Sequence, residues 1–72
     1  MKPLEIKGAR TRLGLSQKYM AQQLNITEAS YGKKERGLVR FTHPEKVTVA
    51  RLLSLTAAQV NDYFFDGMMP IS

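Results

Sequence analysis

The chain has 72 residues, a formal net charge of +5 and no cysteine. A chain this short buries only about 60% of the surface that its unfolded form exposes, so we expect one marginally stable domain over residues 1–72. Without cysteine, and with His43 as its one histidine, the sequence offers no disulfide and argues against a metal site. Its serines have no His/Asp arrangement around them, so we predict neither an enzyme nor a cofactor or small-molecule substrate.

Membrane-spanning and targeting signals are not evident in this sequence. No stretch approaches the ~20 apolar residues that cross a bilayer, and the first residues lack the apolar core of a signal peptide. We therefore expect a cytoplasmic protein that has no membrane partner.

The positive charge is concentrated in the first half of the chain. Residues 1–40 hold nine Lys/Arg and three acids, whereas residues 41–72 hold two and three. A basic half of this kind can meet a polyanion such as nucleic acid. A positive charge is also compatible with binding to a membrane surface, or with a soluble protein that binds no polyanion. The function class therefore has to be inferred from the residue pattern.

The first helix is expected over residues 4–13. Apolar residues recur there at helical spacing, namely at Ile6, Ala9 and Leu13. Gly14 is placed to end this helix in the left-handed conformation.

A second and a third helix come next, with a very short break between them. Ser16 is a good N-cap for a helix over residues 17–24, whose apolar side is formed by Met20, Ala21 and Leu24. Asn25-Ile26-Thr27 then interrupts the pattern, because Asn tolerates the left-handed conformation and Thr27 can cap the third helix. This third helix should run from Glu28 to about Arg36 and stop at Gly37.

The rest of the chain predicts two more helices. Residues 38–43 have no clear period and are expected to form a loop, after which Pro44 fits the first turn of a helix that ends near Ser54. The candidate core residues of this fourth helix are Val47, Val49, Ala50 and Leu53. Thr56 and Gln59 have the spacing of a capping box for a fifth helix before Gly67, with an apolar stripe of Val60, Tyr63 and Phe64. We therefore predict an all-α fold of five short helices.

Two helices joined by a three-residue turn have the geometry that sets one helix across a DNA backbone and the next in the major groove. The residues of this segment, about 16–37, also resemble the Cro/repressor-type helix-turn-helix family, which is called the xenobiotic-response-element type as well. The resemblance extends over about residues 4 to 66 and is carried by the following residues: Gly14-Leu15-Ser16-Gln17, Ala21, Leu24, Ile26-Thr27 and Lys33-Lys34-Glu35-Arg36-Gly37. It implies a lambda-repressor-like domain and an ion pair between Arg10 and Glu35.

Three positions depart from the family pattern. The chain has Asn25 where the turn usually has Gly, Tyr31 where a buried Ile or Val is usual, and Lys34 where an aromatic residue or Leu is usual. The segments Phe41-Thr42, Pro44-Glu45 and Tyr63-Phe64-Phe65 look like those of small regulators encoded by prophages of low-GC bacteria, several of which also carry Tyr at the Tyr31 position.

The candidate DNA-reading residues share the face of the third helix opposite Tyr31, and they are Glu28, Ala29, Gly32, Lys33 and Arg36. Glu28 can accept from a cytosine amino group or simply favour the helix N-terminus, Ala29 can pack on a thymine methyl, and Lys33 can donate to guanine. Gly32 is unfavourable inside a helix, which suggests close approach either to DNA or to another helix.

A second set of residues is expected to contact the phosphates of the DNA backbone. The family resemblance implies that Gln17 and Thr27 bind phosphate at helix N-termini, where free amides and the helix dipole favour an anion. Lys18, Arg36 and Arg40 are further candidates, and Lys34 fits solvent or phosphate equally well.

The C-terminus is more apolar than a short tail needs to be. Its crowded residues are Phe64, Phe65, Met68, Met69 and Ile71, in a segment that includes the apolar tail 67–72. Some of them are expected to form a protein interface, such as a two-fold dimer that spaces two recognition helices one DNA turn apart. The other interpretation is that Phe64 and one Met complete the core.

From these features we expect a Cro-like repressor of a prophage or mobile element that binds a double-stranded DNA operator as a homodimer. The alternative is an antirepressor or modulator with weak DNA binding of its own, which acts in a hetero-complex with another repressor. Glu28 and Gly32 on the reading face give weight to this alternative.

Overall fold

The computed structural model describes residues 1–65, and within this range the chain forms five α-helices and no β-strand. The helices, in chain order, are α1 (Pro3–Arg12), α2 (Gln17–Leu24), α3 (Glu28–Glu35), α4 (His43–Leu52) and α5 (Ala57–Phe65). The prediction of an all-α fold with five helices is confirmed for this part of the chain. None of the five is both long and apolar enough to cross a membrane.

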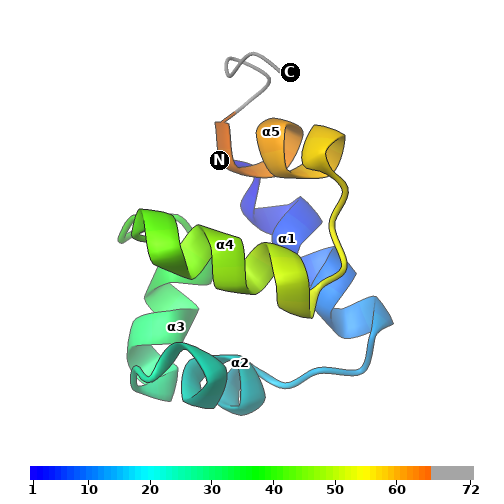
Figure 1. The fold of residues 1–72 in the computed structure, drawn as a ribbon. Helices are drawn as coiled ribbons and strands as arrows, with labels where there is room; N and C mark the ends of the chain where they lie inside the picture. The colour runs from blue at the N-terminus through cyan, green and yellow to red at the C-terminus, as the bar shows by residue number, and fades with distance from the viewer. Residues whose placement is uncertain (66–72) are drawn as a thin grey trace.

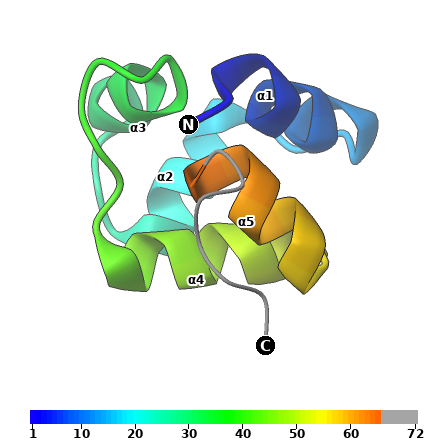
Figure 2. The same cartoon turned by 90° about the horizontal axis from the view of Figure 1, so that it is seen from above.

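The helices enclose one core between them. Helix α4 lies across the middle of the molecule, with α2 and α3 at one end and α5 at the other (Figure 1). The view turned by 90° shows α1 and α4 on opposite sides of the molecule, with α2 and α5 between them (Figure 2). This arrangement leaves the outer sides of α2 and α3 free of other helices.

Side-chain caps fix where the helices begin. The hydroxyl of Ser16 accepts from the amide of Tyr19 at 3.0 Å, and that of Thr27 accepts from the amide of Ser30 at 3.0 Å. Each hydroxyl satisfies an amide that has no partner inside the helix, which is why these residue types favour the N-cap. The N-caps predicted for α2 and α3 are therefore confirmed.

The capping box predicted for α5 is also present. The amide of Gln59 donates to the Thr56 hydroxyl at 3.1 Å, and the amide of Thr56 donates to the Gln59 side chain at 2.8 Å. Two amides at the start of the helix are thus satisfied reciprocally.

Two apolar residues of the predicted helices, of which Val47 was a core candidate, lie on the surface. Val47 is 59% exposed because it is two positions from the buried Val49, and such residues do not share a helix face. Leu13 is 52% exposed and comes directly after the last residue of α1, whose final turn projects beyond α4 (Figure 1). The core prediction for Val47 is wrong, and Leu13 is not buried with Ile6 and Ala9, whose helical spacing it continues.

The core contains three aromatic rings in edge contact. Tyr31 and Phe41 have ring centroids 6.1 Å apart, and Phe41 and Phe64 have centroids 5.7 Å apart, both in T-shaped geometry. Phe64 is only 5% exposed, so its assignment to a protein interface is wrong, because it closes the core over Phe41. The other interpretation, that Phe64 completes the core, is the one that the structure supports.

Candidate functional site

The corner between α2 and α3 is tight because of two residues. Asn25 adopts the left-handed conformation, with φ at 58°, and ends α2. The amide of Ile26 then donates to the carbonyl of Ala21 at 3.0 Å, and Ala21 itself is buried. These contacts turn the chain within the three residues 25–27, so that α3 starts directly after α2.

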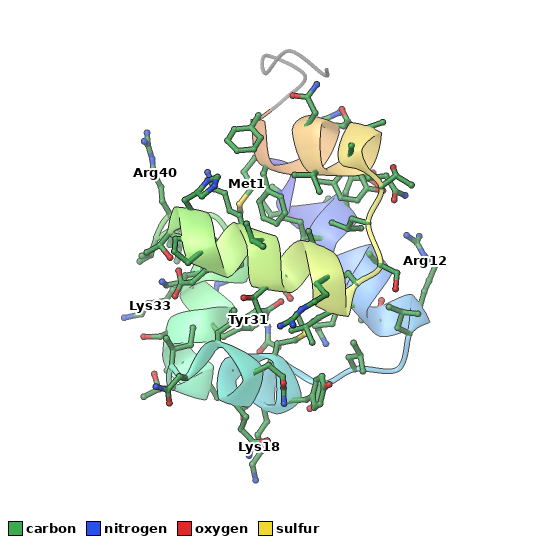
Figure 3. All side chains as sticks on the ribbon, in the orientation of Figure 1. Met1, Arg12, Lys18, Tyr31, Lys33 and Arg40 are labelled. Carbon is green, nitrogen blue, oxygen red and sulfur yellow. The ribbon has the colours of Figure 1, made fainter. Side chains whose placement is uncertain are left out.

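The outer side of α3 is open to solvent, and so is the N-terminal turn of α2 beside it. The exposed candidates there are Lys18, Thr27, Glu28, Ala29, Lys33 and Arg36. In Figure 3 the side chains of Lys18 and Lys33 point away from the molecule, whereas Tyr31 points into it. One face of α3 is thus committed to the core and the other is available to a partner.

Gly32 is an exception on this side of α3. It is buried, and a Cβ built on it would lie 3.3 Å from Nη1 of Arg36 and 3.7 Å from Oε1 of Gln17. The side chain of Gln17 from α2 therefore lies against the backbone of α3, and the expectation of an open surface at Gly32 is wrong. Of the two reasons considered for a glycine here, approach to another helix is the one observed.

A buried ion pair holds α3 against α1. Arg10 donates from Nε to Oε2 of Glu35 at 2.7 Å and from Nη2 to Oε1 at 3.1 Å, and the two side chains are 9% and 2% exposed. Arg10 also donates from Nη1 to the carbonyl of Leu15 at 2.7 Å, which ties the same guanidinium to the segment before α2. Arg10 and Glu35 thus form the pair that the family resemblance implies.

Two further donors complete the environment of the Glu35 carboxylate. The Tyr31 hydroxyl donates to Oε2 at 2.7 Å, and Nε2 of Gln17 donates to Oε1 at 3.2 Å. One buried carboxylate therefore joins α1, α2 and α3. Such a charge is tolerated because it is paired and hydrogen-bonded, and the arrangement fixes the orientation of α3 more than it adds net stability.

This network shifts the pKa of each of its titratable groups. Burial alone raises the pKa of Glu35, but the hydrogen bonds from Arg10, Tyr31 and Gln17 outweigh it, so the pKa lies below its ordinary value. Burial, and then the bond to Glu35, raise the pKa of Tyr31 well above its ordinary value. The bond to Glu35 also raises the pKa of Arg10, so all three groups keep the charge state that the network needs.

Lys34 has a partner that the sequence interpretation missed. It forms an ion pair with Glu45 at the start of α4, and the two side chains are 12% and 13% exposed. The Glu45 side chain also accepts from the amide of Thr42 at 2.7 Å, and the amide of Glu45 donates to the Thr42 hydroxyl. These two bonds form a capping box. The spacing Thr42-x-x-Glu45 was a visible signal for this cap.

The Lys34–Glu45 pair also affects a pKa. Burial raises the pKa of Glu45, but the bonds from Lys34 and from the Thr42 amide outweigh it and leave the pKa below its ordinary value. Lys34 is therefore a link between α3 and α4, rather than a group held out to solvent or phosphate.

The remaining candidates lie away from the α2–α3 corner. Arg40 is exposed at the opposite end of the molecule from Lys18 (Figure 3) and lines a cavity together with Phe65. Phe65 is half-buried, with the ammonium of Lys46 4.4 Å from its ring centroid. The other residues predicted for a protein interface lie outside the described residues, and they are Met68, Met69 and Ile71.

Comparisons of this chain with protein-family models, with curated proteins and with solved structures find no match. Among residues 1–65, no group of three or more His, Asp or Glu side chains could hold a metal ion. The corner between α2 and α3, with the buried network behind it, is therefore the candidate functional site.

Proposed function

We propose that this protein binds double-stranded DNA sequence-specifically and regulates transcription, with α2 and α3 acting as a helix-turn-helix. The observation that carries the proposal is the division of α3 into two faces. Tyr31 and Glu35 anchor one face in a buried network, while Glu28, Ala29 and Lys33 are exposed on the other. A rigidly held helix with an open face is what entry into the major groove requires.

The open face of α3 carries groups that match base edges. Lys33 can donate to O6 and N7 of guanine, Ala29 can pack on the methyl group of thymine, and Glu28 can accept from the amino group of cytosine. In this proposal, these three residues distinguish sequences. Gly32 contributes no contact of its own, because Gln17 and Arg36 lie over it.

Phosphate contacts set the register of the protein on the duplex. The N-termini of α2 and α3 present free backbone amides next to Gln17 and Thr27, and Lys18 and Arg36 add positive charge. The side-chain nitrogen of Gln17 has two hydrogens, of which one is donated to Glu35. The second remains for a phosphate oxygen, so the buried network also orients this contact.

The proposal extends to a Cro-like repressor of a prophage or mobile element, acting in the cytoplasm as a homodimer on a palindromic operator. A single helix-turn-helix is a small interface, and a two-fold dimer spaces two of them about 34 Å apart, one turn of DNA.

A second candidate function is that of an antirepressor that binds another regulator through this same face. The observation in its favour is Glu28, an exposed acid at the start of α3. Its carboxylate repels phosphate, and only a cytosine amino group that donates to it would offset this repulsion. A partner regulator captured by the protein, together with the absence of any selected DNA sequence, would favour this function.

The test is a selection of binding sites from a pool of random DNA duplexes, followed by affinity measurements over a salt series. We expect one enriched sequence, and we expect Lys33→Gln to relax base preference at one position. Lys18→Gln should weaken all sequences alike and lower the salt slope by about 1. Arg51→Gln on the exposed side of α4 is the matched control and should change neither property. Equal behaviour of the Lys33 and Lys18 variants would contradict the assigned roles.

A further inference from the structure

A cavity of about 410 Å³ lies between the segment before α4, α4 itself and the end of α5. This volume falls within the range of pockets that bind small molecules, roughly 300–1,000 Å³. Its walls are formed by Met1, Arg40, Phe41, Lys46, Phe64 and Phe65. In Figure 3, Arg40 and Met1 lie in the upper part of the molecule, above Lys33 and Lys18.

The lining of this cavity combines an aromatic floor with two cations. Phe41 and Phe64 are buried and in edge contact, and Phe65 stands half-buried beside them. Among the lining residues that lie in the described range 1–65, none is an acid. Within residues 1–65, neither Arg40 nor Lys46 forms an ion pair, whereas Lys34 nearby is paired with Glu45. The cavity therefore has positive charge that the described part of the chain does not neutralise.

We propose that this cavity binds a small amphipathic anion, namely an aromatic carboxylic acid. The ring packs against Phe64 and Phe65, and the carboxylate accepts charge-assisted hydrogen bonds from Arg40 and Lys46. Such bonds are about twice as strong as bonds between neutral groups, and the apolar floor favours a ring over a hydrated inorganic ion. An aromatic amine of the same size lacks the acceptor that these two cations need.

The cavity is connected to α3 through one ring contact. Phe41, which forms part of its wall, packs edge-to-face on Tyr31 at 6.1 Å between centroids, and Tyr31 donates to Glu35. A bound acid can thus alter the support of α3, which makes the cavity an effector site. This consequence depends on the proposed DNA-binding function, whereas binding of the acid does not.

Binding is therefore tested on the full chain without DNA, by titrating ¹⁵N-labelled protein with 3-phenylpropionate and recording amide chemical shifts. We expect saturable shifts at residues 40, 41, 46, 64 and 65, and binding of the neutral 3-phenyl-1-propanol about tenfold weaker, equivalent to about 1.4 kcal/mol. The absence of saturable shifts, or equal binding of the alcohol, would overturn the proposal.

Two variants and a matched control test whether Arg40 and Lys46 bind the carboxylate. Arg40→Gln and Lys46→Gln should each weaken 3-phenylpropionate severalfold, while Arg51→Gln, on the same helix as Lys46 but outside the cavity, should leave it unchanged. An equal loss in the Arg51 variant would contradict the site. A peptide that ends in phenylalanine shares the same chemistry, so N-acetyl-Gly-Phe is titrated as well. If the peptide binds more tightly than the free acid, the assignment to a small acid is wrong.

Discussion

The hydroxyl of Tyr31 donates to Oε2 of Glu35 at 2.7 Å, one turn further along α3. Tyr31 lies where the Cro/repressor pattern that the sequence resembles has Ile or Val, and its hydroxyl is tolerated in the core because it is hydrogen-bonded. The ring itself is fully buried and packs on Phe41, so one side chain contributes to the core and to the ion-pair network. Its two roles can be separated by a single substitution.

Tyr31→Phe should keep the ring contacts and remove the donor to Glu35. Hydrogen bonds to charged groups contribute roughly 1.5–3 kcal/mol, so we expect a loss of about 2 kcal/mol in the free energy of unfolding. Urea denaturation measures it. Tyr19→Phe is the control, because Tyr19 is 38% exposed and should change stability by less than about 0.5 kcal/mol. Equal effects of the two substitutions would show that the bond to Glu35 is not formed.

Stability should fall in acid because two carboxylates have a lowered pKa in the folded protein. For Glu35 and Glu45 the unfolded chain binds the proton more readily than the folded one. Their contribution is therefore fully present above the ordinary pKa of 4.5 and is lost as the pH falls through the folded values. Urea denaturation between about pH 3 and about pH 7 measures this dependence.

Glu45→Gln should flatten that pH dependence, because one of the two groups no longer titrates. Glu5→Gln is the matched control, since Glu5 is exposed on α1, and it should leave the profile as it is. A stability that rises on acidification, or a profile that Glu45→Gln does not change, would contradict the account.

Gly32→Ala should stabilise the protein. Alanine is favoured over glycine inside a helix by about 1 kcal/mol, and the new Cβ would lie 3.3 Å from the far end of the Arg36 side chain. Arg36 is exposed and can move by a few tenths of an ångström, so most of the gain should appear in thermal or urea denaturation. A destabilised variant would mean that Gln17 and Arg36 are held rigidly over α3.

Asn25 should respond in opposite ways to glycine and to alanine. Its φ of 58° lies in the left-handed region, which alanine adopts at an expense of about 1 kcal/mol and glycine adopts freely. Asn25→Ala should therefore lower the free energy of unfolding, and Asn25→Gly should keep or raise it. Equal stability of the two variants would contradict this turn geometry.

Local patterns predicted the elements of this fold better than the contacts between them. Ser16, Asn25 and Thr27 act through neighbouring backbone groups, so the bounds of α2 and the start of α3 follow from the sequence. Val47 was misassigned because Val47 and Val49, two positions apart, cannot share one face of α4, and only packing against other helices shows which of the two is buried.

The candidate site shows the same division between local and long-range information. The exposed positions of Glu28, Ala29 and Lys33 follow from helical spacing. The bonds of Gln17 and Tyr31 to Glu35 depend on how α2 and α3 pack, and Lys34 with Glu45 joins two helices across a loop. Gly32 lies on the predicted helix, but part of its cover is Gln17 from another helix, which spacing does not reveal.

Mapping the protein surface that contacts DNA tests the proposed helix-turn-helix more directly than any other measurement. The ¹⁵N-labelled chain is titrated with the duplex selected from the random pool, and amide shifts are followed to saturation. We expect the largest shifts on the open face of α2 and α3, at Lys18, Thr27, Ala29 and Lys33. Shifts centred on α4 and α5, or the absence of saturable binding to any duplex, would contradict the proposal.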